Sequence, residues 1–355
     1  MSGVSERIAP AGAGAAAAAG DAVARPLLDV RDLRVTFTAR ERRDVLAVDG
    51  VSFSVAAGET VGLVGESGSG KSVTSLAVLG LLPRRGVRVE GEVWFDGTDL
   101  LTLSSRRLRD IRGRDVAMVF QDPMSSLNPV VPIGVQVTEV LQRHRDLAGA
   151  EARDAATELL ARVGIPDPAR RLREYPHQFS GGMRQRALIA MALACRPRLL
   201  IADEPTTALD VTIQAQILEL LRALVVDSGT ALVMITHDLG IVAGLCDRVA
   251  VMYAGRIVES AARHPLFAAP RHPYTGGLLG SVPRLNAPRG QPLQPIAGSP
   301  TDVLPWARGC AFAPRCGNRV EVCTTTTPAL TDDGPDRSLR CHHPLDPAQR
   351  VGVTR

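Results

Sequence analysis

Residues 65–72 read Gly-Glu-Ser-Gly-Ser-Gly-Lys-Ser and fit the pattern G-x-x-x-x-G-K-[ST]. Lys71 is the only lysine in a chain of 355 residues in which lysine and arginine together number 41. The preceding residues, Thr60 to Val64, predict a buried strand, and residues 72–79 predict a helix. Strand, glycine loop and helix in this order present backbone N–H groups and a helix N-terminus to an anion, which predicts a phosphate site.

The loop chemistry favours a nucleoside triphosphate over a glycine turn that merely caps a helix. Lys71 offers a compact ammonium on a flexible stem, which reaches between β- and γ-phosphates where the wide guanidinium of arginine would not fit. Ser72 offers a hydroxyl to Mg²⁺. We expect ATP rather than GTP, because the Asn-Lys-x-Asp motif of Ras-type NTPases needs a second lysine. The expected loop contacts are Gly65, Glu66, Ser67, Gly68, Ser69, Gly70, Lys71, Ser72 and Val73.

A second strand is predicted at residues 198–204, where four apolar residues precede Asp203 and Glu204. Acids at the carboxyl end of a core strand face the nucleotide in parallel α/β sheets. We expect Asp203 to hold the Mg²⁺ shell and Glu204 to polarise the attacking water. The alternative is a pair of strand-end carboxylates that simply face solvent.

Residues 179–186, Phe-Ser-Gly-Gly-Met-Arg-Gln-Arg, predict another helix N-terminus with free backbone donors. A chain that binds one nucleotide hardly needs two phosphate sites. A head-to-tail dimer, in which this turn closes on the γ-phosphate held by the partner, accounts for both. Ser-Gly-Gly by itself is also a common helix N-cap.

Composition and charge exclude several classes of protein. The net charge is +4, from 41 basic and 37 acidic side chains, and does not indicate a nucleic-acid surface. The densest basic run, residues 106–114, is broken by an acid and apolar residues, which is typical of a solvated surface. No apolar run is long enough to span a bilayer, and no signal peptide is expected, so we place the protein in the cytosol. Residues 1–26 predict a disordered, Ala/Gly-rich tail.

Four cysteines gather near the C-terminus, at Cys310, Cys316, Cys323 and Cys341. Disulfides are not expected in the cytosol, and the spacing is not the paired C-x₂-C of zinc ribbons. Spacing alone leaves a metal centre and unrelated reduced thiols equally open.

The motifs occur in an order that resembles the nucleotide-binding subunit of an ABC transporter, over roughly residues 27–345. They are GESGSGKS, VFQDP at 119–123, FSGGMRQR, LLIADEP at 199–205, ALD at 208–210 and ITHD at 235–238. The resemblance implies an α/β P-loop NTPase domain at 27–259 with a helical subdomain at about 125–185. Strand patterns at 29–37, 50–55 and 91–95 predict its small antiparallel subdomain over the adenine side.

The resemblance also assigns roles to single residues. It implies that Phe37 stacks on adenine and that Gln121 reaches Mg²⁺ and the attacking water. It implies that Asp210 orders the dimer seam and that His237 contacts the γ-phosphate and orients Glu204. The signature segment is expected to contact the ATP of the partner through Ser180 and Gly182, with Gly181 and Met183 beside them. The family usually has Leu and Gln where Phe179 and Met183 stand, which leaves the Ser-Gly-Gly donors intact.

The C-terminal part, residues 260–355, is similar to the extension of oligopeptide, dipeptide and nickel importer ATPases. The similarity rests on HPYT at 272–275 and on the cysteine-containing stretch that begins GCAFAPRC at 309–316. It implies a [4Fe–4S] cluster on Cys310, Cys316, Cys323 and Cys341.

The resemblance implies an ATPase, with ATP and Mg²⁺ as cofactors, that energises import of di- or oligopeptides. We expect it at the cytoplasmic face of the cell membrane as a peripheral subunit. The expected partners are a second, paralogous ATPase subunit, two transmembrane permeases and an extracytoplasmic solute-binding protein, with no nucleic acid. The alternatives are an importer of nickel or another small solute, a non-transport ABC ATPase that acts on DNA or ribosomes, and a solitary P-loop kinase.

Overall fold

The structure is a computed structural model, in which residues 25–38, 44–207, 209–282, 296–298, 308–334 and 336–346 are described. Most of the predicted N-terminal tail, residues 1–24, lies outside the described residues.

Strands of the described residues form two sheets, one of four strands and one of eight. The smaller sheet has the order β2-β1-β4-β5, and the larger sheet has the order β11-β12-β10-β9-β3-β8-β7-β6. The strands are β1 (Leu28–Phe37), β2 (Val45–Val55), β3 (Thr60–Val64), β4 (Val87–Phe95), β5 (Thr98–Asp99), β6 (Val116–Val119), β7 (Leu199–Asp203), β8 (Ala231–Thr236), β9 (Arg248–Tyr253), β10 (Arg256–Ala262), β11 (Thr331–Asp332) and β12 (Ser338–Leu339).

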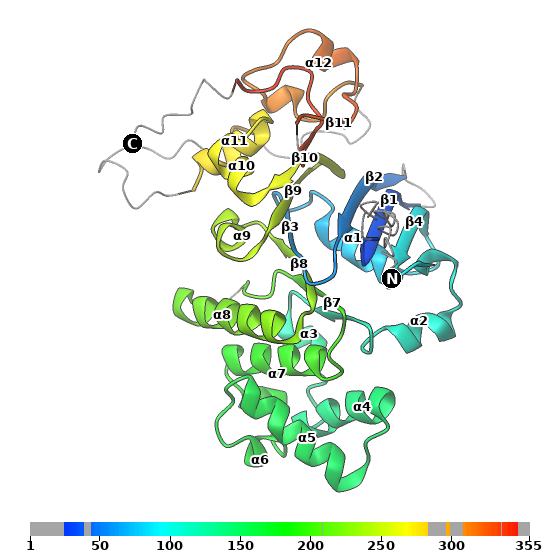
Figure 1. The fold of residues 1–355 in the computed structure, drawn as a ribbon, viewed down its shortest axis with the longest axis vertical. Coiled ribbons are helices and arrows are strands. Elements are labelled where there is room, and N and C mark those ends of the chain that lie inside the picture. The colour runs from blue at the N-terminus through cyan, green and yellow to red at the C-terminus, as the bar shows by residue number, and fades with distance from the viewer. Residues whose placement is uncertain are drawn as a thin grey trace, which may run out of the picture.

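Helices cover the larger sheet and form one end of the molecule (Figure 1). They are α1 (Lys71–Val78), α2 (Ser105–Ile111), α3 (Pro123–Ser126), α4 (Ile133–Arg145), α5 (Gly149–Arg162), α6 (Pro168–Arg171), α7 (Gly181–Leu193), α8 (Val211–Ser228), α9 (Leu239–Leu245), α10 (Arg263–Ala268), α11 (Pro273–Gly280) and α12 (Val322–Thr325). Short 3-10 turns lie at Leu100–Thr102, Pro176–Gln178 and Ala313–Arg315.

The larger sheet is parallel in its centre, where β6, β7, β8, β3 and β9 run in the same direction. Its strands are apolar at successive positions because both faces are covered. In β7, Leu199 and Ile201 belong to one apolar cluster, whereas Leu200 and Ala202 belong to the cluster on the opposite face. Burial on both faces is the physical reason for the continuous apolar runs from which β3 and β7 were predicted.

The smaller sheet is antiparallel, as predicted from the patterns at 29–37, 50–55 and 91–95. Helix α1 shares one apolar cluster with this sheet and with the face of β7 that contains Ile201. The predicted strand and helix around the glycine loop are also confirmed, as β3 and α1. The loop therefore lies where the two sheets meet α1.

The helical end lies between β6 and β7 in sequence and at the bottom of Figure 1. Helix α5 is amphipathic, and Gly164 follows it with φ of 73°. Buried side chains on successive helices join this end to the sheet core, for example Leu141, Leu160 and Ile189.

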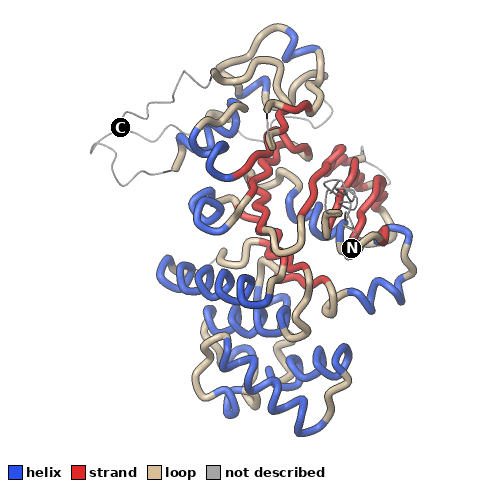
Figure 2. The backbone as a smooth tube through the Cα atoms, in the orientation of Figure 1, coloured by secondary structure: helices blue, strands red, loops and turns tan. Residues whose placement is uncertain are grey.

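The C-terminal residues extend the larger sheet. β9 and β10 form a hairpin across Ala254 and Gly255, and Glu259 of β10 lies opposite Leu339 of β12. The predicted domain boundary after residue 259 therefore falls inside β10, and the extension is joined to the ATPase part by strand pairing as well as by chain (Figure 2). The division into domains stays a prediction.

Candidate functional site

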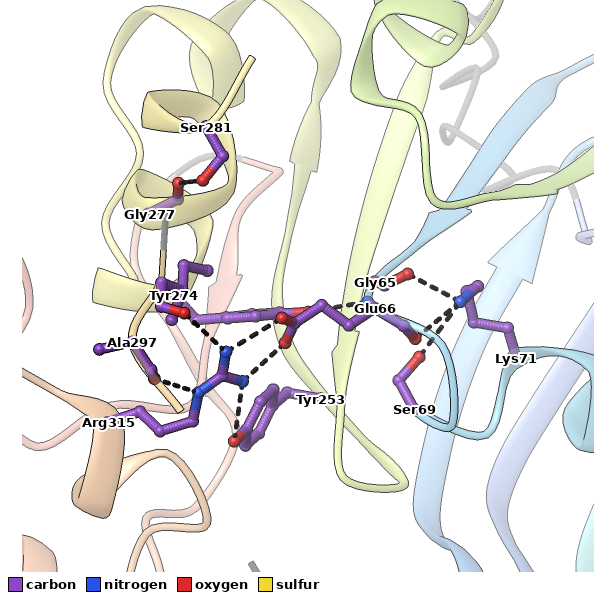
Figure 3. A network of polar contacts seen from close by, with 11 residues as sticks. Gly65, Glu66, Ser69, Lys71, Tyr253, Tyr274, Gly277, Ser281, Ala297 and Arg315 are labelled. Carbon is purple, nitrogen blue, oxygen red and sulfur yellow. Dashed lines mark hydrogen bonds and ion pairs between the residues drawn. The ribbon is translucent and has the colours of Figure 1, made fainter. Parts of the chain in front are cut away.

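The glycine loop holds Lys71 in place through its own backbone. The ammonium nitrogen Nζ donates to the carbonyl oxygens of Gly65 at 2.7 Å and Glu66 at 3.0 Å (Figure 3). The side chain is buried, and burial lowers the pKa of Lys71, although the charges of Glu204, Asp203 and Glu66 oppose the shift. The backbone of the loop thus fixes the ammonium of Lys71 beside the carbonyl oxygens of Gly65 and Glu66.

Two glycines of the loop leave no room for a side chain. Gly70, the residue before α1, has φ of 101°, and a Cβ there would lie 2.6 Å from the carbonyl oxygen of Ala47. A Cβ on Gly65 would lie 2.2 Å from the carbonyl oxygen of Met252. The neighbours are backbone atoms, which cannot move aside as a flexible side chain could. The loop conformation thus depends on glycine at these positions.

Ser72 and Asp203 meet at the carboxyl end of the parallel strands. The Ser72 hydroxyl donates to Oδ1 of Asp203 at 3.0 Å, although 131 residues separate them. Burial raises the pKa of Asp203, and the hydrogen bond from Ser72 and the charge of Lys71 oppose the shift. Mg²⁺ prefers oxygen ligands and needs few from the protein when phosphate oxygens and water supply the rest. The hydroxyl and carboxylate present here fit that requirement.

Glu204 lies next to this pair, and three side chains bind its carboxylate. Gln121 Nε2 donates to Oε2 at 3.0 Å, and the Thr207 hydroxyl donates to the same oxygen at 2.9 Å. His237 Nδ1 lies 3.2 Å from Oε1. Burial acts to raise the pKa of Glu204, but hydrogen bonds from His237 and Thr207 outweigh it and lower the pKa below its ordinary value. The carboxylate is therefore kept ionised and oriented.

The backbone at Glu204 is also unusual, because its φ of 45° places a residue with a bulky side chain in the left-handed region. Its N–H donates to the carbonyl oxygen of Ile235 in the neighbouring strand β8 at 2.9 Å, which fixes this conformation.

Thr207, whose hydroxyl binds the carboxylate of Glu204, was not predicted. A hydroxyl three residues after the expected base was the signal that could have identified it.

Other predicted site residues are not joined to this group within one chain. The Ser180 hydroxyl accepts from the N–H of Met183 at 3.3 Å and caps α7, with Gly181 and Gly182 opening the helix. Asp210 caps α8 by accepting from the N–H of Ile213 at 2.9 Å. Phe37 ends β1, half-buried, and packs against the apolar cluster of the smaller sheet. Within the described ranges, no hydrogen bond or ion pair connects these three places to the glycine loop.

The four C-terminal cysteines come close together but do not form a metal-holding arrangement. The N–H of Cys310 donates to the carbonyl oxygen of Cys323 at 2.8 Å. Burial, with a smaller contribution from the other three thiols, raises the pKa of Cys341 to about 12. Among the residues that the structure describes, no three His, Cys, Asp or Glu side chains are placed to hold a metal ion. The structure thus does not show the expected cluster, although four thiols are the donor type that iron–sulfur clusters take.

Two side chains of the C-terminal extension reach the glycine loop, and no role was predicted for either. Tyr274 and Arg315 both bind Glu66. Residues 272–275 stand out in the sequence, but nothing local indicates that they contact residue 66.

None of the helices in the described part of the chain combines the length and apolar character needed to cross a bilayer.

Comparison with known families gives two matches. Residues 48–207 match the family described as ABC transporter, and residues 258–323 match the family described as oligopeptide/dipeptide transporter, C-terminal region.

Individual relatives match over nearly the whole chain. The dipeptide transport ATP-binding protein DppD of Bacillus subtilis (strain 168) is 52% identical over 316 residues, 89% of this chain and 94% of its own length. The oligopeptide transport ATP-binding protein OppD of Escherichia coli (strain K12) is 50% identical over 320 residues, 90% of this chain and 94% of its own. Among solved structures, the dimeric ATP-binding cassette MJ0796 bound to ADP and Pi has a TM-score of 0.60 and 29% identity. It covers 66% of this chain and 98% of its own.

Proposed function

The chain belongs to the ABC transporter family and carries the oligopeptide/dipeptide transporter C-terminal region, and on this premise we propose that it hydrolyses ATP to energise peptide import. The relatives reported above are named for transport of dipeptides or oligopeptides, which supports peptides as the solute. The solute itself is selected by other subunits of such a transporter.

One observation carries the ATPase assignment. Glu204 accepts from Gln121 and Thr207, contacts His237, and lies one residue after Asp203, which binds Ser72 of the glycine loop. Lys71 and Ser72 bind the phosphates and Mg²⁺, and Glu204 removes a proton from water as it attacks the γ-phosphate. Phosphoryl transfer needs little beyond positioning and charge stabilisation, and these side chains supply both.

We assign the remaining site residues to a dimer. Ser180 and Gly181 are exposed at the N-terminus of α7, with Gly182 and Met183 half-buried beside them. This turn is not joined to the glycine loop of its own chain, which supports contact with the ATP of a partner. Asp210 lies on the seam, and Phe37 stacks on adenine. The partner is a paralogous ATP-binding subunit, and two permeases and an extracytoplasmic solute-binding protein complete the transporter at the cytoplasmic face of the membrane.

The test is to purify the protein from membranes together with the subunits that accompany it and to reconstitute the complex in vesicles. We expect ATP hydrolysis that rises with a transported peptide, and peptide uptake that stops in the Glu204→Gln variant. Glu219→Gln is a matched control, because Glu219 is an exposed carboxylate on α8. Recovery with ribosomes or DNA instead of permeases would contradict the proposal.

The [4Fe–4S] cluster on Cys310, Cys316, Cys323 and Cys341 is a separate part of the proposal. It is supported by four thiols that lie close together, because burial and then the charges of neighbouring thiols raise the pKa of Cys310, Cys316 and Cys341. No step of ATP hydrolysis passes through it. An absorption spectrum of the full chain after anaerobic purification tests it: a visible iron–sulfur band that a Cys323→Ser variant lacks supports the cluster, and a colourless protein contradicts it.

A further inference from the structure

Glu66, the second residue of the glycine loop, has a partner for each of its polar groups (Figure 3). Its N–H donates to the hydroxyl of Tyr274 at 2.9 Å. Its carbonyl oxygen accepts from Nζ of Lys71 at 3.0 Å. Its carboxylate accepts from both terminal nitrogens of Arg315, at 2.7 and 3.0 Å. Tyr274 and Arg315 of the C-terminal extension thus bind Glu66. Glu66 in turn binds Lys71 of the loop.

Arg315 is fixed on every side. Its side chain is only 4% exposed, and its Nε donates to the carbonyl oxygen of Ala297 at 2.8 Å. Its guanidinium carbon lies 5.8 Å from the ring centre of Tyr253 and 6.0 Å from that of Phe312. A planar guanidinium that is packed and bound in this way can meet a carboxylate in one orientation only. It therefore sets the position of the Glu66 side chain instead of following it.

Tyr274 is equally rigid. It is fully buried, and its ring lies 4.6 Å from that of Tyr253 and 5.3 Å from that of Phe312, measured between centroids. It stands in the first turn of α11, which His272 caps by accepting the N–H of Tyr274 on Nδ1 at 3.0 Å. The packing therefore holds the phenol oxygen of Tyr274 beside the backbone N–H of Glu66.

A surface ion pair between exposed side chains would contribute little, because solvent screens it and both side chains lose entropy. This pair differs in three respects: the cation is buried, the contact is bidentate, and the same glutamate is also held through its backbone N–H. Stability of the extension alone would not require a contact to the backbone of residue 66. The arrangement is that expected of supports which preorganise a binding loop.

We propose that Arg315 and Tyr274 are positioning residues for the phosphate loop, and that the C-terminal extension sets the affinity for ATP through Glu66. The inference rests on the ATP site proposed above. When Tyr274 and Arg315 hold Glu66 in place, its carbonyl oxygen keeps the ammonium of Lys71 in one position before the nucleotide binds. When either support is removed, Glu66 and Lys71 sample other positions, and ATP has to order them on binding.

The test uses the full chain and measures the dissociation constant for Mg²⁺-ATP alongside thermal unfolding. Tyr274→Phe keeps the packed ring and removes only the hydroxyl. We expect it to weaken binding about three- to tenfold, as for loss of one hydrogen bond. Arg315→Gln removes a charged, bidentate contact, and we expect binding at least about tenfold weaker. Arg315→Lys keeps the charge and should recover part of the loss.

Arg271→Gln is the matched control. Arg271 makes a similar paired contact with Asp333 inside the extension, at 2.9 and 3.4 Å. The variant should lower the unfolding temperature without changing the affinity for ATP. A control that weakens ATP binding as much as Arg315→Gln would show general loosening of the extension and overturn the proposal.

A double variant provides the second criterion. Once Arg315→Gln is present, adding Glu66→Gln should weaken binding little further, because both changes break the same contact. Folded Tyr274→Phe and Arg315→Gln variants that bind ATP as tightly as the unmodified chain would refute the inference. Failure of the unmodified chain to bind ATP would refute the proposed function instead, so the two failures are distinguishable.

Discussion

The side-chain amide of Gln121 donates to Oε2 of Glu204 at 3.0 Å across 83 residues of sequence. Strand pairing is the reason for this contact. β6 and β7 are adjacent and parallel, with Val119 opposite Ala202, so residues that follow each strand emerge at the same edge of the sheet. Gln121 lies two positions after β6 and Glu204 one position after β7. The register thus places an amide donor on the carboxylate of the proposed base.

The first prediction concerns this base. Glu204→Gln should slow ATP hydrolysis about 10²- to 10⁴-fold, which is the usual contribution of a general base. ATP should still bind, because Lys71 and Ser72 are unchanged, and the protein should accumulate as a closed dimer. Phosphate release, ATP binding and size in solution measure the three effects. Ordinary turnover in this variant would exclude Glu204 as the base.

The second prediction concerns the single lysine. Lys71→Arg keeps the positive charge but replaces a compact ammonium, held by the Gly65 and Glu66 carbonyls, with a planar group that needs more space. We expect ATP affinity at least about tenfold lower, measured by equilibrium binding. Tight binding of ATP by the arginine variant would show that charge alone suffices and that geometry in the loop is unimportant.

The third prediction separates backbone strain from steric clash. Gly70→Ala introduces a Cβ at φ of 101°, 2.6 Å from a backbone oxygen. Gly97→Ala is the matched control, because Gly97 has φ of 77° with nothing within 4 Å of an added Cβ. Strain alone should cost each variant about 1–2 kcal/mol of the free energy of unfolding. Only Gly70→Ala should also lose ATP binding, and equal loss in both would disprove the steric argument.

The fourth prediction concerns pH. Burial lowers the pKa of His272 to about 3, although the nearby backbone carbonyl of Arg340 opposes the shift. Between about pH 6.5 and 3 the unfolded chain therefore binds a proton that the folded chain does not, so the free energy of unfolding falls as pH falls. The contribution of this one group is on the order of several kcal/mol over that window.

His272→Asn tests the effect, since Asn can still cap α11 but does not titrate. The variant should lose less stability than the unmodified chain below pH 6.5, and the difference between the two should be constant above it. Burial also raises the pKa of the neighbouring Glu259, which acts in the opposite direction in both proteins, so the comparison isolates His272. Parallel pH profiles throughout would contradict the assignment.

The strands and helix that carry the proposed ATP site could be predicted from the sequence because each depends on neighbouring residues. The run from Thr60 to Ser72 contains its own strand, turn and helix signals. The acids at 203 and 204 likewise follow directly from the strand that carries them. Capping of α7 by Ser180 is local too. The contact of Thr207 with Glu204 was not predicted, although it is local. The contacts of the C-terminal extension with the glycine loop were not predicted because they join residues more than 200 positions apart.

The sequence by itself determined the glycine loop between a strand and a helix, the two carboxylates at the end of another strand and the Ser-Gly-Gly turn that opens α7, since these follow from backbone propensity and residue chemistry within about ten positions. Only the tertiary structure decided that Arg315 binds Glu66, 249 residues away, and that β12 continues the central sheet beside β10. The first contact accompanies burial of a guanidinium among three aromatic rings, and the second is a pairing of strands distant in sequence. Their energy depends on how separate segments pack, which no local pattern of residues encodes.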